Sequence, residues 1–140
     1  MSKINDGKYL EEAIKKELDK IKISTFRYRR LNDTRAARNI IVAQPADFFL
    51  ADGWSAHLEA KSVSGKTLRL PMFDQYAEMR DWDRAGVYGY VLIHFWEPDV
   101  FCVASINDLE PAPSWSFKSS PKYSTVNEAL RAILGDILPA

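Results

Sequence analysis

The sequence predicts an α/β fold in which one mixed β-sheet is flanked by helices. Apolar residues recur at helical spacing near both ends of the chain, at 7–22 and 125–138. Between these stretches lie short alternating or continuous apolar runs, which are typical of strands, and a further helical stretch at 71–85. The expected order is helix, three strands, helix, two strands, helix. A chain of 140 residues is expected to form one domain, spanning 1–140.

The first predicted helix, 7–22, carries Ile14, Leu18 and Ile21 on one side. Extending this apolar stripe back by one turn reaches Glu11. A carboxylate in line with a buried stripe costs free energy unless a metal ion or a lysine pairs with it. The alternative is that Glu11 stays hydrated at the helix start, where the helix dipole favours an acid.

A half-buried strand is predicted at 24–31, within a basic stretch at 22–46 that has six basic residues and one acid. This segregation contrasts with the formal net charge of 0 for the whole chain. Arginine suits bidentate contacts with phosphate, so we expect this stretch to bind DNA; a solvated charged strand is the alternative. The expected DNA contacts, which include one lysine in a later turn, are Arg27, Arg29, Arg30, Arg35, Arg38 and Lys66.

A β-hairpin is predicted over 47–62, with its turn at Asp52-Gly53. Asp47 opens the first strand, and the second strand carries Glu59 and Lys61. Alternate residues of a strand point to the same face, so Glu59 and Lys61 are expected to share one face. Two carboxylates beside a lysine suit a divalent cation acting on a phosphodiester. A solvated Glu/Lys pair on an ordinary hairpin is the alternative.

The second predicted helix, 71–85, has a polar exception, Gln75, on its apolar side. Gln75 either has a functional role or is satisfied by local backbone. The lone cysteine, Cys102, is expected to be a buried structural thiol. After the second helix we expect two apolar strands, at 88–96 and 100–104. A Pro- and Ser-rich loop is expected at 111–124 and the last helix at 125–138.

The chain carries one ordered set of motif residues: Gly7-x-x-x-Glu11, Asp47, Glu59-x-Lys61 and Gln75. This set resembles the RecU-type and archaeal Holliday junction resolvases of the restriction-endonuclease-like PD-(D/E)xK nuclease superfamily. The similarity covers about 7–101 and includes the LEAKS and VLIHF strands. It implies a restriction-endonuclease-like core, a homodimer and cleavage of branched DNA. It also implies that Gln75 holds a phosphate or a metal-bound water.

The same resemblance implies roles for the other site residues. Asp47 and Glu59 would bind Mg²⁺, for which Mn²⁺ would substitute, with the backbone carbonyl of Ala60 as a further ligand. Glu11 would act through a second metal ion or a metal-bound water. Lys61 would orient or activate the attacking water.

Two further functions stay open at this stage. One is a less selective nuclease acting on linear duplex, flap or replicating DNA, and the other is a DNA-binding module without turnover. No apolar run is long enough to cross a bilayer and the N-terminus lacks an apolar signal region, so a cytoplasmic location is expected.

Overall fold

The computed structural model describes residues 7–31, 44–65, 67–69, 75–109, 114–116 and 121–140. Within these residues the protein is mixed α/β, with a five-stranded mixed sheet and three α-helices, which confirms the predicted fold class. In chain order the elements are α1 (Gly7–Leu18), β1 (Arg27–Arg30), β2 (Phe48–Ala51), β3 (Ser55–Val63), β4 (Thr67–Arg69), α2 (Tyr76–Arg84), β5 (Tyr88–Phe95), β6 (Val100–Ser105), β7 (Ser114–Ser116) and α3 (Val126–Leu134). Two short 3₁₀ helices follow β6 and α3, at Ile106–Leu109 and Gly135–Ile137.

The main sheet has the strand order β1-β2-β3-β5-β6. Strands β1, β2 and β3 pair antiparallel, β3 and β5 pair parallel, and β6 returns antiparallel to β5. The parallel pair requires a crossover connection, and this connection contains α2. At the predicted hairpin turn, Gly53 adopts a positive φ of 74° and the amide of Asp52 donates to the carbonyl of Trp54.

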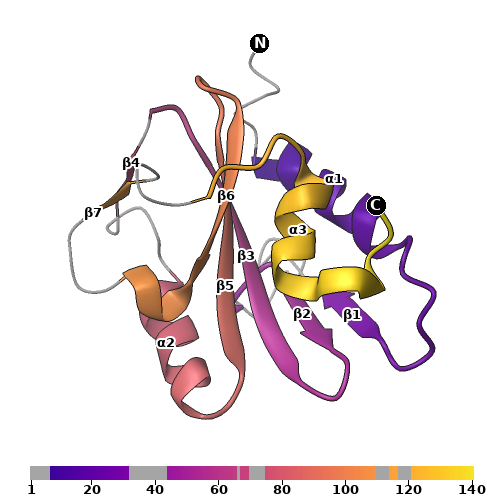
Figure 1. Ribbon diagram of the computed structural model, residues 1–140. Helices are drawn as coiled ribbons and strands as arrows, with labels where there is room; N and C mark the ends of the chain where they lie inside the picture. The colour runs from indigo at the N-terminus through magenta and orange to yellow at the C-terminus, as the bar shows by residue number, and fades with distance from the viewer. Residues whose placement is uncertain (1–6, 32–43, 66, 70–74, 110–113, 117–120) are drawn as a thin grey trace, which may run out of the picture.

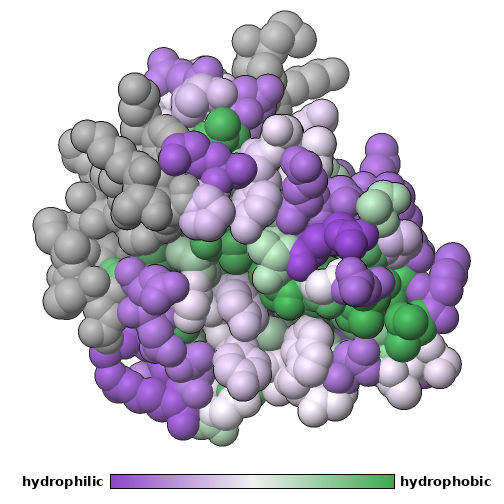
Figure 2. Space-filling view, in the orientation of Figure 1, coloured by the Kyte–Doolittle hydropathy of each residue, from purple (hydrophilic) through white to green (hydrophobic). Residues whose placement is uncertain are grey.

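Helices cover both faces of this sheet (Figure 1). Helices α1 and α3 pack on one face, where their apolar side chains join a buried cluster that includes Leu58, Ala60 and Leu92 of the sheet. Helix α2 packs on the other face, where Met79 joins Val91 in a second buried cluster. The outer side of α2, at the lower left in Figure 2, is hydrophilic.

The buried stripe of α1 differs from the predicted one. Leu10, Ile14 and Leu18 are almost completely buried, so the stripe follows a spacing of four residues and reaches Leu10 rather than Glu11. Glu11 lies beside the stripe and is partly exposed. The helix also ends at Leu18, four residues earlier than expected, and Ile21 packs on the cluster from the segment that follows.

Two other expectations are corrected. The segment 111–124 is not only a loop, because β7 pairs antiparallel with β4 to form a separate two-stranded sheet. The C-terminal helix does not run unbroken over 125–138. It begins after Thr125, whose side chain caps it, and stops at Gly135, which has a positive φ of 66°.

For α2, the observed helix begins at Tyr76, and 70–74 lie outside the described residues. The predicted apolar side of this helix is only partly buried: Met79 is buried, whereas Trp82 is 41% exposed. Cys102 is buried, as expected for a structural thiol. None of the helices that the structure describes is both long and apolar enough to span a membrane.

Candidate active site

Two carboxylates, Asp47 and Glu59, meet where β2 begins, beside the middle of β3. Asp47 immediately precedes β2, and the hairpin register, which pairs Phe48 with Leu58, places Asp47 opposite Glu59 of β3. The Oδ2 atom of Asp47 accepts a hydrogen bond of 2.9 Å from the backbone N–H of Ala60. This bond holds the Asp47 carboxylate against β3, beside the backbone that carries Glu59.

Lys61 lies next to this pair. Its Nζ atom is 3.5 Å from Oε2 of Glu59, and both side chains point to the face covered by α2 because they alternate with Leu58 and Ala60, which face α1 and α3. The Glu59 side chain is only 3% exposed, whereas the Lys61 side chain is 21% exposed. The lysine therefore connects a buried carboxylate to the protein surface.

The electrostatics of the pair favour a bound cation. Burial, reinforced by the charge of Asp47, raises the pKa of Glu59 to about 8. Burial also raises the pKa of Asp47 to about 6, although the hydrogen bond from the Ala60 amide acts in the opposite direction. Burial disfavours the ionised form of both carboxylates, and the charge of Asp47 adds to this effect on Glu59, so a nearby positive charge stabilises the pair.

The oxygen atoms of Asp47 and Glu59 suit a divalent cation. The Oε1 atom of Glu59 is buried and has no hydrogen-bond partner among the described residues, so an acceptor is left free inside the site. No three His, Cys, Asp or Glu side chains of the described segments gather into a metal-binding group. Mg²⁺ is commonly held by one or two carboxylates, with water and substrate phosphate completing its shell, and Asp47 with Glu59 fits this pattern.

Glu11, on α1, acts on this carboxylate pair. Its negative charge is one of the causes that raise the pKa of Asp47, so the two side chains are electrostatic neighbours. Glu11 is also engaged elsewhere, because its Oε1 atom lies 3.0 Å from Nη2 of Arg30 in β1. The same guanidinium donates from Nη1 to Oε2 of Glu12.

Gln75 precedes the first turn of α2, and its Oε1 atom is buried without a hydrogen-bond partner in the described parts of the chain. Trp82, near the other end of α2, contacts His57 near the start of β3, with ring centroids 5.4 Å apart. Gln75 and Trp82 are about 10 Å apart along the helix axis. The helix itself packs on β5 and on the 3₁₀ helix Ile106–Leu109.

The predicted DNA contacts are only partly described. Arg29 is exposed on β1, and Arg27 is exposed but donates to the carbonyls of Ser24 and Phe26. Arg30, as shown above, is held by two acids of α1. Arg35, Arg38 and Lys66 lie outside the described residues.

The sequence reasoning missed His57, which shares its face of β3 with Glu59 and Lys61. Its ring is buried between Phe49 and Trp82, burial lowers its pKa, and its Nδ1 atom lacks a hydrogen-bond partner among the residues described. The alternation of positions 57, 59 and 61 in one strand was a sufficient signal to place it there.

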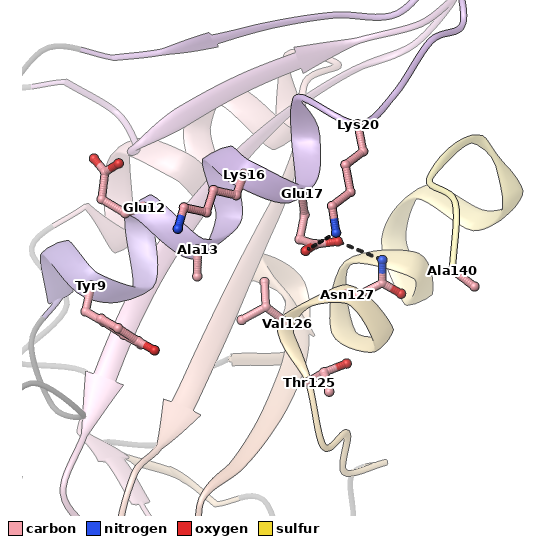
Figure 3. A pocket seen from close by; sticks show the side chains of 10 residues that line it. All are labelled: Tyr9, Glu12, Ala13, Lys16, Glu17, Lys20, Thr125, Val126, Asn127 and Ala140. Atoms are coloured by element: carbon pink, nitrogen blue, oxygen red, sulfur yellow. Dashed lines mark hydrogen bonds and ion pairs between the residues drawn. The ribbon is translucent and has the colours of Figure 1, made fainter.

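A separate groove of about 600 Å³ lies between α1 and α3. Figure 3 shows the side chains that line it. Lysines and glutamates both line it, and Glu17 is already paired with Lys20 and Asn127. The lining of this groove includes none of the site residues predicted from the sequence, so we assign the candidate active site to Asp47, Glu59 and Lys61.

Comparison of the chain with protein-family models, curated proteins and solved structures finds no significant match.

Proposed function

We propose that the protein is a divalent-cation-dependent DNA endonuclease with a restriction-endonuclease-like core, and that it cuts branched DNA. The observation that carries this proposal is the convergence of Asp47, Glu59 and Lys61, with the lysine ammonium 3.5 Å from the Glu59 carboxylate. The arrangement of three antiparallel strands followed by a crossover helix and a parallel strand supports it.

In this proposal Asp47, Glu59 and the carbonyl of Ala60 hold Mg²⁺ or Mn²⁺. When bound, the cation polarises a phosphoryl oxygen and lowers the pKa of the attacking water. Lys61 orients that water and stabilises the negative charge that develops on the phosphate. Gln75, at the neighbouring helix end, positions a phosphate oxygen with its amide.

The test is cleavage of labelled four-way junctions, flaps and linear duplexes, with Mg²⁺ and with EDTA. We expect paired nicks in the junction with Mg²⁺ only, and no cleavage by Asp47→Asn. The matched control is Asp81→Asn, on the exposed side of α2, which should cut like the wild type. A folded protein that binds DNA but never cuts it would refute the enzyme and leave a DNA-binding module. Equal cutting of all three substrates would point to a less selective nuclease.

A four-way junction needs two symmetric cuts, so the proposal includes a homodimer. Sedimentation of the protein alone and with one equivalent of junction tests this part. A monomer in both conditions would contradict paired resolution and leave single-strand nicking.

A further inference from the structure

Arg30 is expected to contact DNA, but the structure shows its guanidinium already bound to two acids of α1. Nη2 pairs with Glu11 at 3.0 Å, and Nη1 donates to Glu12. A bidentate contact with phosphate draws on the same positive charge and on nitrogen atoms that these acids already engage. Phosphate therefore competes with Glu11 and Glu12 for Arg30.

The contacts are of a kind that DNA can displace. The side chain of Arg30 is 31% exposed and that of Glu12 is 59% exposed. Ion pairs at such exposed positions contribute little, because water screens them and ordering the side chains costs entropy. The carboxylate of Glu12 points away from Ala13 and from α3, so α3 does not hold it beside Arg30 (Figure 3).

Releasing Arg30 has a consequence for the active site. Arg30, which holds Glu11, pairs with Phe48, and the next amide, that of Leu31, donates to the carbonyl of Asp47 at 2.8 Å. Glu11 therefore lies close to the strand end that carries Asp47, and its charge acts on that carboxylate. Without the guanidinium, the free carboxylate of Glu11 adds a third negative charge beside Asp47. A cation at the site then becomes more favourable.

We propose that Arg30 couples DNA binding to completion of the cation site. In the free protein Glu11 and Glu12 are paired with the Arg30 guanidinium. When DNA binds, a backbone phosphate replaces the two acids, and Glu11 becomes available to the cation that Asp47 and Glu59 would hold. Glu12 is then a positioning residue that keeps Arg30 occupied until DNA arrives. This inference rests on the proposed nuclease function and deepens it.

The first test measures affinity for a labelled four-way junction in EDTA, where no cleavage occurs. Glu12→Gln removes a competitor for Arg30 and should tighten binding about fivefold. Glu17→Gln is the matched control, because it removes one charge from α1 at a residue paired with Lys20 and Asn127 instead. It should change affinity less than twofold. In an Arg30→Ala background, Glu12→Gln should match that control.

The second test measures Mn²⁺ binding by electron paramagnetic resonance, with and without junction. The wild type should bind Mn²⁺ more tightly when DNA is present, and Glu11→Gln should lose this gain. Two outcomes would overturn the coupling. One is an equal effect of Glu12→Gln and Glu17→Gln on DNA affinity, and the other is a DNA-dependent gain in Mn²⁺ affinity that survives Arg30→Ala. Normal cleavage with those results would leave the proposed function intact, whereas absence of DNA binding in every variant would end both.

Discussion

Replacing Glu59 with Gln should stabilise the cation-free protein at neutral and alkaline pH. The pKa of Glu59 is raised from 4.5 to about 8 by burial and by the charge of Asp47. The folded protein therefore holds this proton more tightly than the unfolded chain does. The contribution of this bound proton to the free energy of unfolding is complete below pH 4.5 and is lost as the pH rises to about 8. One pKa unit corresponds to about 1.4 kcal/mol, so the loss reaches about 3 kcal/mol at pH 7 and about 5 kcal/mol above pH 8.

The assay is urea unfolding in EDTA between pH 4 and pH 9. Glu59→Gln should have a higher free energy of unfolding than the wild type, and this difference should grow with pH and disappear near pH 4. The difference should be somewhat smaller than the pKa shift alone predicts, because the variant also loses the contact between Glu59 and Lys61. Glu97→Gln, at an exposed turn, is the control and should follow the wild type. Mg²⁺ should restore stability to the wild type only. Parallel pH curves for the wild type and Glu59→Gln would refute the buried carboxylate pair.

Three further predictions concern the site, the DNA surface and the core. Lys61→Ala should lower the cleavage rate about 10²-fold while Mn²⁺ affinity stays within a factor of about two, as measured by single-turnover kinetics and by metal titration; an unchanged rate would remove the lysine from the mechanism. Arg29→Ala should reduce the slope of log affinity against log salt by about one, measured by anisotropy, whereas a flat salt dependence in the wild type would exclude phosphate contacts. Gly89→Ala should destabilise the protein by about 1–3 kcal/mol in thermal unfolding, because the new Cβ would lie 2.9 Å from the Ile106 side chain. Wild-type stability for this last variant would mean that α2 and the 3₁₀ turn shift freely.

The fold class and the hairpin follow from local patterns. Alternation in β3 and the Asp-Gly turn are encoded within a few residues, so they place Glu59 and Lys61 on one face without knowledge of the rest of the chain. The pairing of β4 with β7 joins segments more than forty residues apart, and no local periodicity encodes it. The prediction that 111–124 forms only a loop was therefore wrong at Ser114–Ser116, the residues that pair with β4.

The surroundings of Glu11 were predictable only in part. Both Leu10 and Glu11 are one turn before Ile14, at spacings of four and three residues, and the structure chooses Leu10 for the core. The partners of Arg30 come from another element, and composition alone suggested phosphate instead. Side-chain ion pairs across elements depend on packing that the sequence pattern does not specify.

The hairpin that joins β2 to β3 also guards against misfolding. If its strands slipped by one residue, Glu59 and Lys61 would turn into the apolar layer beneath α1 and α3, in place of Leu58 and Ala60. Burying two charges among hydrocarbon side chains is strongly unfavourable, so the alternative alignment is much less stable. The residues that we assign to catalysis thus also help to fix the register in which the two strands pair.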